Sequence, residues 1–154
     1  MSQSSLFDDA PGAANPVLDV FFDGGARGNP GPAAIGAVVF DPATDPPRVV
    51  ATVSQVIGET TNNVAEYRAL IAGVEAAARL GARRVRVHGD SMLVVQQLRG
   101  KWKVKSEHLK PLLAEAKRAL ASFDAVEIEH VRREENIDAD ALVNAALDAA
   151  MDAQ

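Results

Sequence analysis

The sequence has no cysteine among its 154 residues, which excludes disulfide bonds, thiolate metal sites and cysteine nucleophiles. Aromatic residues are sparse, at 5% of the chain. Apolar runs are short: residues 33–40 form one of the longest, far below the roughly 20 residues that a membrane-spanning helix needs. The first 15 residues have neither a basic start nor an apolar stretch, which argues against a signal peptide. We therefore expect a soluble, cytoplasmic protein with no membrane partner.

The chain also lacks an excess of positive charge, since 16 Lys and Arg face 21 Asp and Glu, for a net charge of −5. This balance argues at first against nucleic acid, because polyanions favour basic proteins. Residues 79–118, however, carry 11 basic and three acidic side chains, a net charge of +8. Their densest piece, residues 99–105, places Trp102 between Lys101 and Lys103, a pattern that can bind phosphates and stack on a base. The alternative is a solvated surface with Trp102 buried in the core.

Hydrophobic periodicity and turn residues predict a disordered tail at residues 1–15 and one domain at residues 16–151. Strands are expected at 17–23, 33–40, 49–57, 84–88 and 125–131, and helices at 62–80, 91–99, 106–122 and 136–150. Asn62 or Asn63 is expected to cap the first helix, and Ser106 the third. The order predicts an α/β fold with a five-stranded mixed sheet, three antiparallel strands followed by parallel β-α units, flanked by helices.

Four acidic residues interrupt apolar patterns near the ends of these elements. Asp23 ends the first strand, Asp90 follows the fourth, and Glu66 and Asp140 lie on helices. Burying a lone carboxylate costs roughly several kcal/mol unless it is paired or binds a metal. If the first and fourth strands are neighbours, the four can meet at one edge of the sheet and form a site for Mg²⁺. Two such ions can cleave a phosphodiester. For each acid alone, a turn or a helix N-terminus is the alternative.

Four blocks carry a resemblance to a known family. They are DGGARGNPGP at 23–32, TTNNVAEY at 60–67, HGDS at 88–91 and NIDADALVN at 136–144. In this order and spacing they resemble type 1 ribonuclease H, in the shorter branch found in archaea and some bacteria, over about residues 17–150. The resemblance implies hydrolysis of the RNA strand of RNA–DNA hybrids to 5′-phosphate and 3′-hydroxyl ends, by a monomer. Some members of this branch also cut RNA duplexes, which leaves that activity open here.

The resemblance also implies the site residues. The catalytic and metal-binding carboxylates would be Asp23, Glu66, Asp90 and Asp140, holding two Mg²⁺ ions, with Mn²⁺ as a substitute. The substrate-binding residues would be Gly24, Gly25, Asn29, Thr61, Asn62 and Asn63. Of these, Gly24, Gly25, Asn62 and Asn63 match positions that contact the minor groove, where the 2′-hydroxyl distinguishes RNA. Asn29 and Thr61 match positions that hold a DNA-strand phosphate. A tight turn for the glycines and a helix cap for Asn62 are compatible alternatives.

The chain departs from the longer members of the family in two places. It lacks their basic helical handle, for which Lys101, Trp102 and Lys103 are the nearest substitutes. It also lacks their loop histidine, so Arg132 or Arg133 is expected to stabilise charge on the phosphate, against the alternative of a surface ion pair. Asp138 is expected to face away from Asp140, since residues two apart on a helix do not align. Two other classes remain as alternatives: other nucleases of this fold, such as integrases, transposases and junction resolvases, and a non-catalytic hybrid-binding module.

Overall fold

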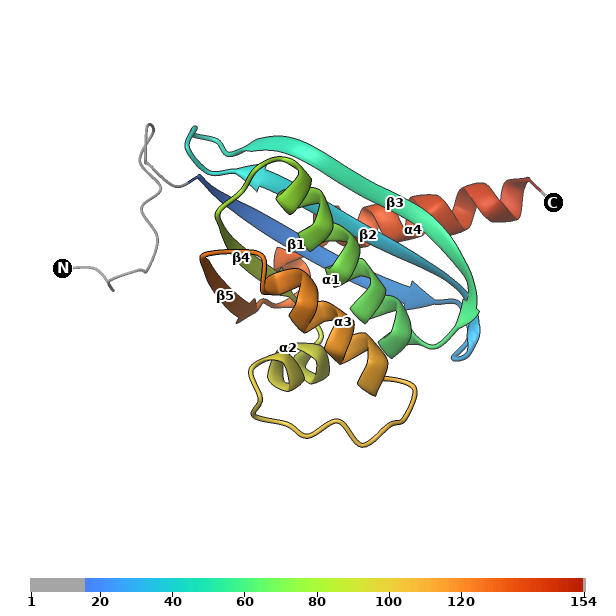
Figure 1. Ribbon diagram of the computed structural model, residues 1–154. Helices are drawn as coiled ribbons and strands as arrows, with labels where there is room; N and C mark the ends of the chain where they lie inside the picture. The colour runs from blue at the N-terminus through green and yellow to red at the C-terminus, as the bar shows by residue number, and fades with distance from the viewer. Residues whose placement is uncertain (1–15, 154) are drawn as a thin grey trace.

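A computed structural model describes residues 16–153 of the chain, so the tail predicted at residues 1–15 lies outside the described residues. Figure 1 shows a single sheet with helices on both faces. The elements are β1 (Val17–Ala26), β2 (Gly31–Asp41), β3 (Arg48–Thr60), α1 (Asn62–Arg79), β4 (Arg84–Gly89), α2 (Met92–Leu98), α3 (Lys110–Leu120), β5 (Ala125–His130), the 3₁₀ helix η1 (Arg133–Glu135) and α4 (Ile137–Asp152).

The strands lie in the order β3-β2-β1-β4-β5. Strands β1, β2 and β3 pair antiparallel, whereas β4 is parallel to β1 and β5 is parallel to β4. The predicted fold class is therefore confirmed, including the change from antiparallel hairpins to parallel β-α units. The β1–β4 pairing matters most for function, because it brings the C-terminal ends of these two strands to one edge of the sheet.

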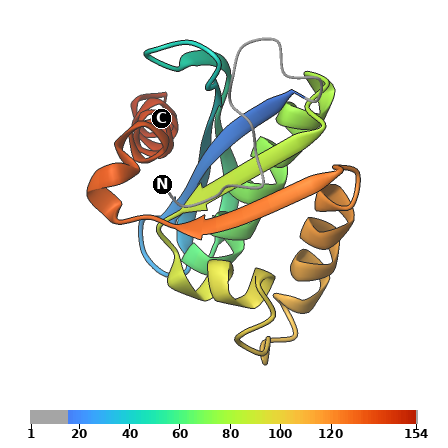
Figure 2. The same cartoon turned by 90° about the vertical axis from the view of Figure 1, so that its left-hand side faces the viewer.

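The two faces of the sheet bury different amounts of apolar surface. Helices α1 and α3 cover one face, and α4 packs on the other (Figure 2). The main core lies under α1, where Val20 and Phe22 of β1 meet Tyr67, Leu70 and Val74, all of them fully buried. A smaller cluster around Val143 and Leu147 holds α4 against β2. No helix in residues 16–153 is long and apolar enough to cross a membrane.

One predicted helix cap and one predicted helix start were wrong, although α1 does begin at residue 62 as predicted. The N-cap of α1 is Thr61, whose hydroxyl accepts a hydrogen bond from the backbone N–H of Val64 at 3.3 Å, so neither asparagine caps the helix. Helix α3 begins at Lys110, and Ser106 lies in the turn before it. The reason is Pro111, which has no N–H to donate and therefore favours the first turn of a helix over its interior. The 3₁₀ helix η1 was not predicted.

Candidate active site

Four carboxylates meet at the edge of the sheet where β1 and β4 end. Asp23 lies on β1 and Asp90 directly follows β4, so the parallel pairing of the strands makes them neighbours. Glu66 lies near the start of α1, and Asp140 lies in the first turn of α4. Together these four residues, called here the carboxylate cluster, line an open cavity of about 450 Å³. The sequence predicted this convergence.

Within the cluster, three residues form a compact set and the fourth is adjacent. One carboxylate oxygen each from Asp23, Glu66 and Asp90 lies within 4.8 Å of the other two. Asp140 lies on the α4 side, close enough to Asp23 to contribute to the raised pKa of Asp23. Asp23 therefore belongs to the compact set and is also the neighbour of Asp140.

A glycine lets the helix that carries Glu66 approach β1. The backbone N–H of Gly24 donates a hydrogen bond to Glu66 Oε1 at 2.9 Å. A Cβ at Gly24 would lie 2.2 Å from the carbonyl carbon of Ala65, so any larger residue would collide with the α1 backbone. At Gly25, in contrast, the nearest atom to an added Cβ would be a methyl group of Val143 at 3.7 Å, an ordinary contact. Gly24 thus sets the depth at which α1 packs on β1.

The electrostatics of the cluster favour a cation. Burial, and then the charges of Asp90 and Asp140, raise the pKa of Asp23 to about 8. Burial, followed by the charges of Asp23 and Asp90, also raises the pKa of Glu66 well above its usual value. Arg133, which lines the cavity, opposes both shifts. A divalent cation would remove the repulsion that raises these pKa values, and the all-oxygen donor set suits Mg²⁺.

A buried amide also orients the cluster. The side chain of Asn136 is 1% exposed. Its Nδ2 donates hydrogen bonds to the carbonyl of Phe22 at 2.9 Å and to Asp90 Oδ2 at 3.2 Å. Asn136 thereby ties the start of α4 to β1 and to one carboxylate. From the sequence, Asn136 was expected to start the last helix and to belong to the block at 136–144, but its contacts with Phe22 and Asp90 were not predicted.

Polar residues predicted to bind substrate lie beside the cavity and bond to one another. Asn62 lines the cavity, and its Oδ1 accepts from the backbone N–H of Ala26 at 2.8 Å. The Oδ1 of Asn29 accepts from the N–H of Asn62 at 3.0 Å. With Thr61 as the cap of α1, these contacts join the β1–β2 connection to the start of the helix. Asn63 is exposed on the first turn of α1.

The basic segment at residues 99–105 lies apart from the cavity, on the connection between α2 and α3. Trp102 is 45% exposed, so the alternative that buried it in the core is wrong. Lys101 and Lys103 are exposed on either side of it. The cluster and this segment form two separate surfaces.

The two arginines after β5 differ in position. Arg133 faces the carboxylate cluster, as described above. Arg132 is exposed, and its backbone N–H donates to Glu135 Oε1 at 2.9 Å. Only Arg133 is therefore placed to act on a group held by the cluster.

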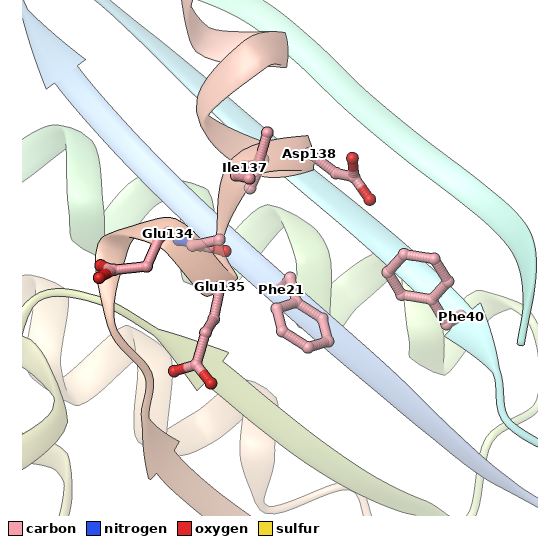
Figure 3. A pocket seen from close by; sticks show the side chains of 8 residues that line it. Phe21, Phe40, Glu134, Glu135, Ile137 and Asp138 are labelled. Carbon is pink, nitrogen blue, oxygen red and sulfur yellow. The ribbon is translucent and has the colours of Figure 1, made fainter.

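Asp138 lies outside the cluster, as its spacing from Asp140 predicted. It lines a different pocket of about 290 Å³, together with Phe21, Phe40 and Glu134. Figure 3 shows Asp138 beside Phe40, in the first turn of α4, which also carries Asp140. Asp138 therefore offers a matched control for its neighbour.

This arrangement is shared with known proteins. Residues 21–146 match the family model described as reverse transcriptase-like. The bifunctional protein Rv2228c of Mycobacterium tuberculosis is 50% identical over 128 residues, which cover 83% of this chain and 35% of that protein. The chain thus spans about a third of the length of this curated relative. The match to the family model places the chain in the reverse transcriptase-like class of domains.

Solved structures narrow the class. The structure of RNase H1 from the halophilic archaeon Halobacterium salinarum matches with a TM-score of 0.82 at 44% identity, covering 86% of this chain and 98% of that chain. LC11-RNase H1, isolated from compost and solved in complex with RNA/DNA hybrid, matches with a TM-score of 0.80 at 40% identity, covering 87% and 99%. The chain belongs to the type 1 ribonuclease H family. The resemblance in its sequence motifs is confirmed.

Proposed function

We propose that this chain is an endonuclease that hydrolyses the RNA strand of RNA–DNA hybrids and leaves 5′-phosphate and 3′-hydroxyl ends. The observation that carries the proposal is the carboxylate cluster, which gathers four acids from four elements in one open cavity. The domain that performs the reaction would be residues 16–151, acting as a monomer. The complex of LC11-RNase H1 with RNA/DNA hybrid supports the choice of substrate.

The cluster fits two divalent ions. Asp23, Glu66 and Asp90 would hold one Mg²⁺, and Asp23 together with Asp140 would hold the second, with Mn²⁺ as a substitute. When bound, the two ions supply charge compensation for the reacting phosphate and activation of the attacking water. The protein's part is to orient the carboxylates. The backbone N–H of Gly24 orients Glu66, and the side-chain amide of Asn136 orients Asp90.

The residues around the cavity would recognise the hybrid. Gly25 and Asn62 line the cavity beside the cluster and would contact the minor groove, where the RNA 2′-hydroxyls are displayed. Asn29 and Thr61 each use an oxygen as acceptor within the protein. Within residues 16–153, the Asn29 amide and the Thr61 hydroxyl donate no hydrogen bond, and these donors would bind a phosphate of the DNA strand.

Two further sets of basic residues would contact the negatively charged hybrid. Arg133 faces the cluster and would stabilise negative charge on the phosphate. The exposed segment around Lys101, Trp102 and Lys103 would bind the hybrid at a distance from the cavity and replace the handle of longer members. A non-catalytic binding module is a poorer interpretation, because it would not need four buried or half-buried carboxylates at one site.

The test is cleavage of an end-labelled hybrid in Mg²⁺, in Mn²⁺ and in EDTA, beside an RNA duplex and a DNA duplex. We expect metal-dependent cleavage of the RNA strand of the hybrid. Asp23→Asn should lower the rate at least about 100-fold, because a residue that binds the metal directly matters more than one that only orients a ligand, whose loss costs about 10–100-fold. Hybrid binding should persist, since most phosphate contacts lie elsewhere.

Asp138→Asn is the control, because it removes the same charge from a carboxylate that lies outside the cluster. It should cleave at the wild-type rate. Absence of hybrid cleavage in both metals, or equal cleavage of the DNA duplex, would contradict the proposed function. Substantial cleavage by Asp23→Asn would remove Asp23 from the metal-binding set.

A further inference from the structure

At the edge of the active-site cavity, the side chain of one arginine contacts residues of α4. Arg27 follows β1, and its guanidinium forms an ion pair with Asp148 Oδ1 at 2.7 Å. The same group donates to the Asn144 side-chain oxygen at 3.4 Å and contacts the sulfur of Met151 at 3.0 Å. Arg27 and Asn144 both line the cavity with the carboxylate cluster. The proposed function gives Arg27 no role in catalysis or in substrate binding.

The contacts of Arg27 lead back to the cluster. Nδ2 of Asn144 lies 3.4 Å from Asp140 Oδ2 and 3.2 Å from the Asp140 carbonyl. The side chain of Asn144 therefore lies between Arg27 and Asp140 and contacts both. A phosphate next to the one held by the cluster would lie along the wall of the cavity that Arg27 forms.

The ion pair with Asp148 is of a kind that opens easily. The side chains of Arg27 and Asp148 are 37% and 64% exposed, and exposed ion pairs contribute little to stability. A guanidinium binds carboxylates and phosphates with the same planar geometry. Asp148 thus occupies the place that a phosphate oxygen would take.

We propose that Arg27 binds a backbone phosphate of the RNA strand, adjacent to the phosphate that is cleaved, and that Asp148 holds the guanidinium in place when substrate is absent. The inference rests on the proposed function, because the cluster must position the cleaved phosphate. We assign the RNA strand because Arg27 lines the same cavity as the carboxylate cluster, which would cleave that strand under the proposed function. The competing role for Arg27 is purely structural, as a link between the β1–β2 connection and α4.

Salt dependence distinguishes the two roles. Each phosphate contact adds about 0.9 to the slope of log affinity against log salt, so it costs about 3.5-fold between about 50 and 200 mM NaCl. We expect the kcat/KM of Arg27→Ala on a hybrid to fall about 3.5-fold less than that of wild type over this range. Arg27→Lys should retain the wild-type slope, since it keeps the charge. A structural link would change the melting temperature and leave the slope as in wild type, which would overturn the proposal.

The control is Arg48→Ala, because Arg48 also forms an exposed ion pair, with Asp41 at 3.6 Å, at the end of β2 far from the cavity. It should keep the wild-type slope. If wild type does not cleave hybrid, the proposed function has failed. If wild type cleaves and Arg27→Ala shows the wild-type slope, only the present inference has failed.

A neutral methylphosphonate placed at single positions of the hybrid identifies the phosphate. One position in the RNA strand, next to the cleavage site, should lower kcat/KM for wild type and have no further effect on Arg27→Ala. Equal losses in both proteins at every position would overturn the contact. Coupling at a DNA-strand position would overturn the assignment to RNA.

The role of Asp148 has its own test. Asp148→Asn should raise kcat/KM at low salt, because Arg27 loses its internal competitor. Asp152→Asn, one turn further along α4, removes the same charge without touching Arg27 and gives the baseline. A fall in kcat/KM for Asp148→Asn, or a rise no larger than that of Asp152→Asn, would overturn this role.

Discussion

The two adjacent glycines of β1 offer a sharp test of how the site is built. Neither Gly24 nor Gly25 has a positive φ, so alanine is allowed by the backbone at both positions. They differ in what an added Cβ meets, which is the α1 backbone at 2.2 Å for Gly24 and a side-chain methyl at 3.7 Å for Gly25. Carbon atoms pack at about 3.5–4.0 Å, so Gly24→Ala must push α1 away from β1 by more than about 1 Å.

The expected cost follows from this displacement. Overpacking a core typically lowers the free energy of unfolding by about 1–3 kcal/mol. Because the added Cβ clashes with backbone atoms, we expect the upper value, about 3 kcal/mol. In a domain of this size, that lowers the melting temperature by about 6–12 °C. The shift would also move Glu66 by about 1 Å, which can cost about 100-fold in rate. Gly25→Ala should change the stability by no more than about 0.5 kcal/mol, because the site is open and alanine loses less entropy on folding.

Thermal unfolding followed by circular dichroism measures the first quantity, and single-turnover cleavage of the hybrid measures the second. Equal melting temperatures for Gly24→Ala and Gly25→Ala would refute the argument that Gly24 sets the packing of α1. A destabilised Gly24→Ala that cleaves at the wild-type rate would refute the link between that packing and the position of Glu66. Gly25→Ala also reports on substrate contact, since only a loss of hybrid affinity is expected from it.

Two further predictions concern buried polar groups. Burial opposes ionisation of Asp19, yet hydrogen bonds from His88 and Arg86 outweigh it and hold its pKa below the usual 3.8. Asp19→Asn should therefore lower the free energy of unfolding by ~3 kcal/mol at neutral pH. This difference from wild type should shrink as the pH falls below 3.8 and through the lower pKa of the folded state. A difference that stays constant in acid would contradict a lowered pKa for Asp19. Asn136→Ala should raise the Mg²⁺ concentration needed for half-maximal activity about 10–100-fold, because Asp90 loses its orienting donor. The KM for hybrid measured at saturating Mg²⁺ should stay unchanged, and a rise in that KM alone would contradict the positioning role.

The parts of the fold that were predictable are those with a local or periodic signal. The strand alternation, the apolar stripe of α1 and the acids that interrupt both patterns led to the correct sheet and to the four carboxylates. The start of α3 was missed because a serine, which caps well, competes with Pro111, whose geometry decides the first turn. The cap of α1 was misplaced because three polar residues in succession, Thr61 to Asn63, can all cap a helix.

What could not be predicted depends on contacts between distant segments. Asn136 bonds to the carbonyl of Phe22, which lies 114 residues earlier in the chain, and no sequence period encodes such a pair. The same holds for Arg27 and Asp148, which look like ordinary surface charges until α4 docks on β2. The need for glycine at position 24 is likewise visible only in the spacing between α1 and β1.

The attachment of α4 has a consequence for when activity can appear. The helix carries Asp140 and is anchored by a small apolar cluster that is separate from the main core. Synthesis proceeds from the N-terminus, so three of the four carboxylates emerge from the ribosome well before the fourth. The main core under α1 contains no residue of α4, but the carboxylate cluster is not complete until the last helix docks. Under the proposed function, a nascent chain gains the ability to cleave hybrid only once nearly all of the domain has been made.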